Sequence, residues 1–295
     1  MTPAELGFLL LGSSLGNPDR KTLTVPQMRT LAQRVRESER PEENRQLWEE
    51  DLKALGYEEL MARRILSLLE QEEEAKIYAS RATQYHCHLL TRATPEYPLA
   101  IRKALVLESP GCIWAKGDLS LLNTPMISLV GSRELYPENQ DFAREAGIQA
   151  AKQGYTLVSG NARGADRTAQ NAALDAGGSV ISIVADSLEQ KYPGKNMLYL
   201  SEDSFDLPFS AYRALSRNRL IHSLGQKTFV AQSSLGTGGT WDGTIRNLKG
   251  HYSPVFCFDD GSEAMEQLIQ MGASPVRTED LEDISSLEPE QNSFL

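Results

Sequence analysis

Short apolar runs alternate with amphipathic stretches through the middle of the chain. Runs rich in Val, Ile, Leu and Phe predict buried strands at residues 126–130, 155–158, 180–184, 227–231 and 254–258. Apolar residues at helical spacing predict helices between and after these strands, over residues 138–153, 165–176, 210–224, 240–248 and 262–271. Apolar strands that alternate with such helices are typical of a parallel sheet covered on both faces. We therefore expect an α/β domain over residues 86–276.

The first 85 residues show helical patterns instead. Thr24 is placed to cap a helix that begins at Val25-Pro26, and residues 42–55 keep helical spacing until Gly56 ends it. A further helical run covers residues 60–78. We expect a small helical domain over residues 1–85, of the SAM or helix-hairpin-helix kind. It is either a plain packing domain or a contact surface for a partner.

The end of the chain is acidic and poor in large apolar side chains over residues 277–295. Segments of this composition bury too little apolar surface to fold, so we expect a disordered tail. The tail either keeps the protein soluble or covers a basic crevice that has no ligand.

The net charge of −10 is unevenly distributed. Residues 251–295 carry ten acidic and one basic residue, whereas residues 130–250 carry twelve acidic and thirteen basic ones. Local clusters of arginine therefore decide what binds to the central region. The chain has three scattered cysteines, no basic leader and no apolar run of about 18 residues, so we expect a cytoplasmic protein that does not enter a membrane.

Glycines and arginines gather at the carboxyl ends of the predicted strands. Gly131-Ser132-Arg133 follows the first strand, and Ser159-Gly160 with Arg163-Gly164 follows the second. Residues 236–240 follow the fourth strand and precede a helix. Ligands of such sheets bind beyond the carboxyl ends of the strands, where loops of this kind point backbone N–H groups at an anion. Each segment alone is also a common turn, so the hypothesis of a phosphate-bearing ligand depends on the set.

The segment Ser216-Arg217-Asn218-Arg219 adds two guanidinium groups near the start of a predicted helix. A helix start offers unpaired N–H groups, and arginine matches phosphate bidentately. We expect Arg217 and Arg219 to converge with the strand-end motifs on one crevice whose ligand has several phosphates. The carboxylate of Asp166 would repel phosphate, so we expect it to cap the following helix or to orient Arg163.

Several other chemistries have no support. The sequence has no G-x-x-x-x-G-K-[ST] motif, and residues 236–239 lack the spacing of a dinucleotide site. His86 and His88 have no second ligand pair nearby, so an ordinary strand is favoured over a metal site. We expect no catalytic residue, no metal and no cofactor.

Several short motifs follow one another in a particular order. They are Tyr97-Pro98, Trp114-Ala115-Lys116-Gly117, Leu129-Val130-Gly131-Ser132-Arg133, Ser159-Gly160 with Ala162-Arg163-Gly164 and Asp166, Tyr192-Pro193 with Asn196, and Arg217-Asn218-Arg219. Their order resembles the DNA-processing protein A family, also called DprA or Smf, over residues 88–276. The resemblance implies a Rossmann-like fold that binds single-stranded DNA, dimerises, and helps to load the RecA recombinase during natural transformation. It also implies DNA-backbone contacts from Arg133, Arg163, Arg217 and Arg219, and a small helical domain ahead of the sheet.

Three features depart from the family pattern. Gln170 stands where His is usual, Gln232 stands where an acidic residue is usual, and no winged-helix pattern follows residue 276. We therefore expect a divergent member, with defence against phage or a mobile element as alternatives to transformation.

The main hypothesis is a single-stranded DNA-binding module of the recombination-mediator type. We expect its phosphate contacts from Gly131, Ser132, Arg133, Ser159, Gly160, Arg163, Gly164, Lys195, Arg217, Asn218, Arg219, Gly236, Thr237, Gly238, Gly239 and Thr240. Tyr136, Tyr192, Tyr212 and Trp241 are candidates for base stacking. The expected partners are single-stranded DNA, a RecA-type recombinase and a second copy of the chain.

The alternative is a nucleotide sensor or a phosphoribohydrolase-like enzyme that uses the same crevice. Gly238-Gly239-Thr240 is similar to the glycine-rich signature of those hydrolases. Such a reaction needs a carboxylate near the ribose. Because Gln232 is neutral, the candidates are Asp166, Asp242 and Glu202, of which Asp242 is best placed in the sequence.

Overall fold

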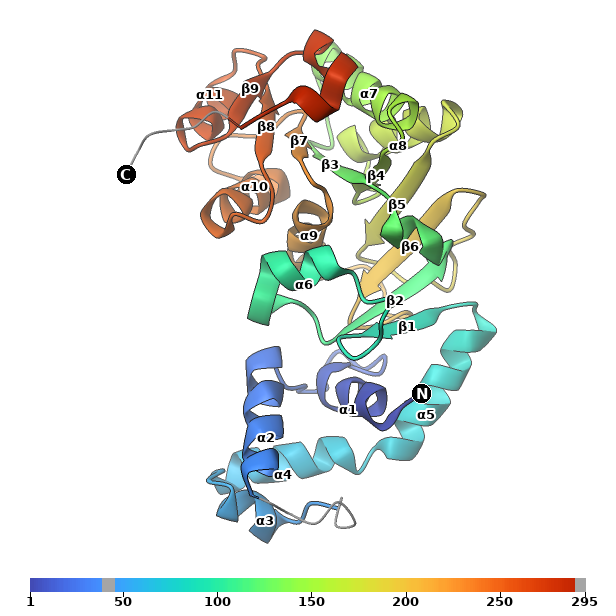
Figure 1. The fold of residues 1–295 in the computed structure, drawn as a ribbon, viewed down its shortest axis with the longest axis vertical. Helices are drawn as coiled ribbons and strands as arrows, with labels where there is room; N and C mark the ends of the chain where they lie inside the picture. The colour runs from blue at the N-terminus through green and yellow to red at the C-terminus, as the bar shows by residue number, and fades with distance from the viewer. Residues whose placement is uncertain (39–45, 290–295) are drawn as a thin grey trace.

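The centre of the molecule is a nine-stranded mixed sheet (Figure 1). A computed structural model describes residues 1–38 and 46–289. The strands lie in the order β1-β2-β6-β5-β4-β3-β7-β8-β9. Their bounds are β1 His88–Thr91, β2 Cys112–Gly117, β3 Met126–Val130, β4 Thr156–Ser159, β5 Ser179–Val184, β6 Met197–Glu202, β7 Thr228–Val230, β8 Val255–Phe258 and β9 Ser274–Val276. The chain builds outward from β3 to β6, then returns to place β7 beside β3. This reversal is the topological switch point of a Rossmann-like sheet.

The predicted parallel sheet is confirmed from β6 to β9, and the opposite edge adds antiparallel strands that the pattern does not predict. There β1 pairs with β2, and β2 with β6, in antiparallel fashion. A parallel connection needs a crossover element that packs on the sheet. The helix between β1 and β2, α6 (Leu99–Leu105), packs against a helix of the central domain instead, so the chain returns antiparallel.

Helices cover both faces of the central strands, as predicted (Figure 1). Helices α7 and α8 pack together against β3 and β4, and α9, flanked by α6 and α10, covers the other face. The bounds are α7 Pro137–Lys152, α8 Ala165–Asp175, α9 Ala211–Leu224, α10 Gly238–Gly250 and α11 Glu263–Gln270. The predicted helices agree with these bounds to within about two residues, as expected where apolar periodicity is strong.

The first part of the chain is helical, and its helices are α1 Pro3–Gly12, α2 Val25–Glu37, α3 Glu49–Ala54, α4 Glu59–Leu69 and α5 Glu72–Gln84. Thr24 caps α2 as predicted, because its side chain accepts a hydrogen bond from the Gln27 N–H. The single run expected over residues 60–78 is two helices, α4 and α5, separated at Glu70-Gln71. Of the helix expected over residues 42–55, residues 42–45 lie outside the described part of the chain.

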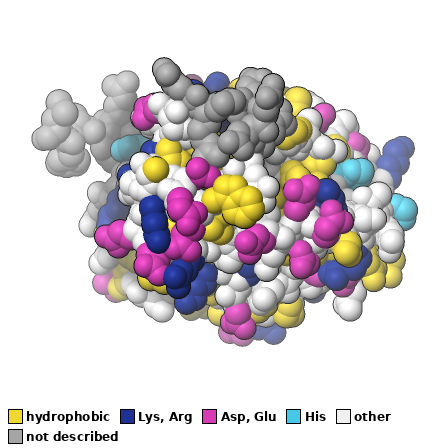
Figure 2. All heavy atoms as spheres, turned by 90° about the horizontal axis from the view of Figure 1, so that it is seen from below, with side chains coloured by type: hydrophobic (Ala, Val, Ile, Leu, Met, Phe, Trp, Pro, Cys, Tyr) yellow, Lys and Arg dark blue, Asp and Glu magenta, His cyan; other side chains and the backbone are white. Residues whose placement is uncertain are grey.

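An aromatic cluster joins the helical region to the sheet. Tyr78 of α5 packs edge-on against Trp114 of β2, with ring centroids 5.5 Å apart, and also contacts Phe205. Beside this cluster, the Ser14 N–H donates to Asp203 Oδ1 at 2.8 Å. The far end of the helical region shows acidic, basic and apolar side chains side by side (Figure 2).

The acidic segment after residue 276 is ordered as far as residue 289, contrary to expectation. Residues Glu279–Ser286 form a 3-10 helix, η3, that packs on α7 and buries Leu281 and Ile284 completely. Lys227 Nζ donates to the Ile284 and Ser285 carbonyls at 2.7 and 3.1 Å. Since Lys227 precedes β7, η3 lies at the amino ends of the strands, away from the carboxyl-end crevice. Within residues 1–38 and 46–289, no helix is long and apolar enough to cross a membrane.

Candidate functional site

A crevice lies beyond the carboxyl ends of β3, β4, β5 and β7. Its larger lobe, of about 1010 Å³, lies at the switch point between β3 and β7 and extends to the start of α10. Its smaller lobe, of about 340 Å³, lies over the ends of β4 and β5. Both lobes are lined by Arg133, Ala162, Arg163, Ala214 and Arg217. The crevice therefore lies at the position that the sequence predicts. Its larger lobe alone is at the upper end of the volumes found for small-molecule sites.

Arg217 is the most constrained cation of the crevice. Its side chain is only 7% exposed, and its Nε and Nη1 atoms have no hydrogen-bond partner among the described residues. Burial lowers the pKa of the guanidinium from its ordinary value, and the charge of Asp166 acts against that shift. A buried charge without hydrogen bonds is costly to maintain. Arg217 is thus ready to receive an anion that enters the crevice.

Gly160 makes room for this guanidinium. A Cβ atom at residue 160 would overlap Nη1, Cζ and Nη2 of Arg217, well inside the 3.0 Å that real Cβ atoms keep. The guanidinium therefore lies directly against the backbone of the loop after β4. The sequence motif predicted that Gly160 takes part in the site, and the structure supplies the steric reason.

Asp166 holds the backbone of the same loop through hydrogen bonds. Its Oδ2 accepts hydrogen bonds from the Gly160 and Ala162 N–H groups, each at 3.1 Å. Burial raises the pKa of the Asp166 carboxyl, and the positive charge of Arg217 opposes this rise. Asp166 thus holds the loop and balances Arg217. It does not orient Arg163, which pairs with Glu134 instead.

The remaining loop residues either line the crevice or shape it. Gly131, Ser132 and Arg133 line the larger lobe. Ser159 lies behind it, since its hydroxyl donates to the Leu129 carbonyl at 2.7 Å. Gly164 has φ 85° and lies against the carbonyls of the residue 132–133 segment, where a side chain would clash. Gly164 therefore supports the crevice and does not line it.

The start of α10 also faces the larger lobe. Thr237, Gly238, Gly239 and Thr240 line it, while Gly236 lies outside the lining. Asn218 Nδ2 donates to the Gly239 carbonyl at 2.9 Å and so ties α9 to this helix start. The free N–H groups and positive dipole end of α10 favour an anion. The helix start predicted for the Arg217 segment is thus supplied by α10, because α9 begins six residues earlier at Ala211.

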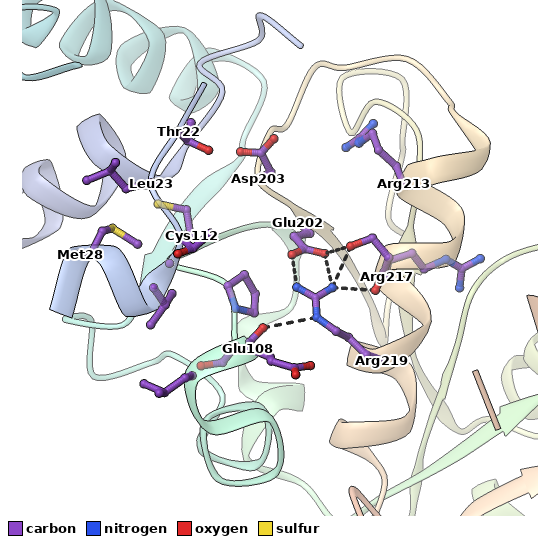
Figure 3. A pocket seen from close by; sticks show the side chains of 18 of the residues that line it. Thr22, Leu23, Met28, Glu108, Cys112, Glu202, Asp203, Arg213, Arg217 and Arg219 are labelled. Atoms are coloured by element: carbon purple, nitrogen blue, oxygen red, sulfur yellow. Dashed lines mark hydrogen bonds and ion pairs between the residues drawn. The ribbon is translucent and has the colours of Figure 1, made fainter. Parts of the chain in front are cut away.

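Arg219 does not reach the crevice. Residues two apart on a helix point about 200° away from each other. Arg219 accordingly lies on the opposite side of α9, where both terminal nitrogens donate to the Glu202 carboxylate (Figure 3). It lines another pocket of about 510 Å³ between α9 and the helical region, which Arg217 also borders. In Figure 3 the Arg217 side chain leaves the helix on the side away from Glu202.

Lys195 is also remote from the crevice. It directly precedes Asn196, whose carbonyl accepts from the Val180 N–H at the amino ends of β5 and β6. Two cations that the sequence pattern does not predict line the smaller lobe, Arg167 and Lys191. Neither follows a strand directly, so only the folded chain shows their position.

Comparison with known proteins agrees with this architecture. A family model described as DNA recombination-mediator protein A matches residues 88–287. The chain belongs to the DNA recombination-mediator protein A family. It is 28% identical over 202 residues to Protein Smf of Escherichia coli (strain K12), a match that covers 63% of this chain and 53% of that protein. The chain thus spans about half the length of this relative.

Two solved structures share the fold of this chain. The X-ray structure of DNA processing protein A from Streptococcus pneumoniae has a TM-score of 0.68 at 22% identity, and the match covers 98% of this chain and 99% of that one. DNA processing protein A from Helicobacter pylori has a TM-score of 0.56 at 24% identity, covering 67% and 94%. The first of these matches includes the helical region, which lies outside the residues matched by the family model.

Gln232, one of the departures from the family pattern, fastens the Arg133 loop. Its Oε1 accepts from the Tyr136 N–H at 2.9 Å, and its Nε2 donates to the Glu134 carbonyl at 3.2 Å. A carboxylate would lose the second of these bonds because it has no proton to donate. Gln170, the other departure, is buried in α8, and its Nε2 has no partner among the described residues.

The three carboxylates considered for hydrolysis have other surroundings. Asp166 is occupied by the loop after β4, and Glu202 by Arg219. Asp242 lines a groove between α9 and α10 and is absent from the lining of both crevice lobes. Of the three, only Asp166 lines the crevice, and its Oδ2 already accepts hydrogen bonds from the Gly160 and Ala162 N–H groups.

The candidate stacking residues are spread over several surfaces. Tyr136 is 64% exposed and lines the larger lobe, whereas Tyr212 lines the separate pocket beside Arg219. Trp241 is buried, and Tyr192 lies over Lys116 with Nζ 5.7 Å from the ring centroid. Phe209, which the sequence reading missed, is 58% exposed and lines the smaller lobe. Each lobe thus has one exposed aromatic ring at its wall.

Proposed function

We propose that the crevice binds single-stranded DNA through its phosphodiester backbone. The observation that carries the proposal is the buried Arg217 guanidinium, whose Nε and Nη1 have no hydrogen-bond partner among the described residues and which faces a crevice lined by further cations. Arginine forms charge-assisted, bidentate bonds with phosphate oxygens. The start of α10 adds backbone N–H groups at the other side of the larger lobe.

A strand fits the crevice better than a single nucleotide does. Arg133, Arg163 and Arg217 line both lobes, and Arg167 and Lys191 continue the cations into the smaller lobe. Tyr136 and Phe209 offer one exposed ring in each lobe, the arrangement that single-stranded nucleic acids use for base stacking. The Helicobacter pylori relative was studied for its single-stranded DNA binding mode. We infer that backbone contacts dominate here and that base specificity is weak.

The test is a fluorescence-anisotropy titration with a labelled single-stranded oligonucleotide at about 50 and about 200 mM salt. Wild-type protein should bind and lose affinity steeply with salt. Arg217→Ala should lose about 30- to 150-fold in affinity, which corresponds to about 2–3 kcal/mol for charge-assisted bonds. Arg144→Ala, which removes an exposed cation from α7, is the matched control. Wild-type affinity in Arg217→Ala would refute the proposal, and competition by a mononucleotide at equal concentration would favour the nucleotide-binding alternative.

We further propose that the protein acts as a recombination mediator in the cytoplasm, as a homodimer that delivers DNA to a RecA-type recombinase. Membership of the family supports this role. Light scattering would measure the oligomeric state. The rate at which RecA assembles on DNA coated by a single-strand-binding protein, with and without this protein, would test delivery.

A further inference from the structure

Two cations of the crevice, Arg163 and Lys191, are already paired with carboxylates of its own wall. Arg163 Nη2 lies 2.9 Å from Glu134 Oε1, and Lys191 Nζ lies 2.6 Å from Asp186 Oδ2. Glu134 and Arg163 line the larger lobe, and Asp186 and Lys191 line the smaller one. The buried Arg217 lines both lobes, and within residues 1–38 and 46–289 its Nε and Nη1 have no hydrogen-bond partner.

Glu134 is held at this position by its backbone. Gln232 fastens the segment on both sides through Tyr136 N–H and the Glu134 carbonyl. Ser132 N–H donates to the Gln232 carbonyl at 3.0 Å, which fixes the start of the same loop. The Glu134 side chain is 88% exposed and is therefore free to move once another anion takes Arg163.

A carboxylate and a phosphate offer the same kind of acceptor to a guanidinium or an ammonium group. We propose that Glu134 and Asp186 occupy two phosphate subsites of the free crevice, one at Arg163 and one at Lys191, and that a DNA strand displaces them. This inference rests on the proposed DNA-binding function. The strand then places successive phosphates at Arg163, Arg217 and Lys191, so it runs from the larger lobe into the smaller one.

The exchange is most feasible at Arg163, because exposed ion pairs are weak, whereas Lys191 and Asp186 are only 18% and 40% exposed. Arg163 and Glu134 are 72% and 88% exposed, so water and salt screen their attraction. The displaced carboxylate stays near the incoming phosphate and repels it. Each carboxylate therefore lowers the affinity for DNA without closing the crevice. In the protein without DNA, the paired cations attract other anions less strongly than unpaired cations would.

The test is a pair of double-mutant cycles measured by anisotropy with a labelled single-stranded oligonucleotide. Glu134→Gln and Asp186→Asn should each raise affinity about three- to tenfold at low salt, because the paired cation is released. In an Arg163→Ala background, Glu134→Gln should change affinity by less than about twofold, and Asp186→Asn should do the same in a Lys191→Ala background.

Asp141→Asn is the matched control, since it removes an acidic partner from an exposed pair with Arg144 on α7 and changes net charge equally. No gain from Glu134→Gln and Asp186→Asn, or an equal gain from Asp141→Asn, would overturn the inference. A gain that persists fully in the Arg163→Ala and Lys191→Ala backgrounds would also overturn it. If wild-type protein binds DNA and Arg217→Ala does not, such a result leaves the proposed function intact. Absence of binding by the wild type would instead refute the function itself.

Discussion

Replacement of Gly160 by alanine tests the central contact of the site with a single methyl group. The added Cβ would occupy the space of the Arg217 guanidinium, whose Nη1, Cζ and Nη2 atoms all lie within 3.0 Å of its ideal position. Backbone atoms cannot yield there, because Asp166 holds the Gly160 N–H at 3.1 Å. The guanidinium must therefore leave its place. The variant should lose what Arg217 contributes to phosphate binding, about 2–3 kcal/mol or about 30- to 150-fold in affinity.

The assay is the anisotropy titration, performed as a double-mutant cycle with Arg217→Ala. If the methyl group acts only through Arg217, Gly160→Ala should have no further effect once Arg217 is alanine. Gly194→Ala is the matched control, since a Cβ at residue 194 meets no atom within 4 Å. Wild-type affinity in Gly160→Ala would refute the reasoning. Losses that add in the double variant would show that Gly160 acts by another route.

Three further predictions concern stability. Arg219→Ala should change DNA affinity by less than about threefold. It should lower the free energy of unfolding in urea by about 1–3 kcal/mol, because the half-buried Glu202 loses its partner. A large loss of affinity would place Arg219 at the DNA. His222 is fully buried, and burial lowers the pKa of its imidazole from 6.5 to about 3. Between pH 3 and pH 6.5 only the unfolded chain carries the proton on this imidazole. The stabilisation is therefore fully present above about pH 6.5 and decreases as the pH is lowered, by about 2 kcal/mol between pH 7 and pH 5. His222→Gln should remove that dependence in urea titrations at both pH values, whereas the exposed His251→Gln should retain it. Leu281→Ala in η3 should cost about 2–5 kcal/mol, and an unchanged melting temperature would show that the acidic segment is not part of the core.

The fold was largely predictable because its main signals are local. The pattern predicts the strand at Met126–Val130 to the residue, since five consecutive buried residues, four of them apolar, end at a glycine. The pattern does not predict β2, β6 and β9, and it meets β1 only at His88. Lys116 interrupts the apolar run of β2 and Pro275 that of β9, and pairing with neighbouring strands gives both their structure.

The order of the acidic segment also depended on distant contacts. Its composition predicts disorder, but Leu281 and Ile284 meet the core, and Gln153 of the segment after α7 donates to the Leu281 carbonyl at 2.7 Å. Two apolar side chains in the right register were enough to order a segment rich in charge. Residues 290–295 of the expected tail lie outside the described part of the chain.

The sequence by itself determined the alternation of strands and helices, and with it the position of a crevice beyond the carboxyl ends of the strands. It also identified Arg133, Arg163 and Arg217 as residues of that crevice. The separation of Arg217 from Arg219 follows from local geometry, since side chains two residues apart on the predicted helix point to opposite sides. Only the tertiary structure brought Lys191 and Phe209 to the crevice and paired Arg163 with Glu134. These positions depend on packing between segments distant in the sequence, which no local pattern of residues records.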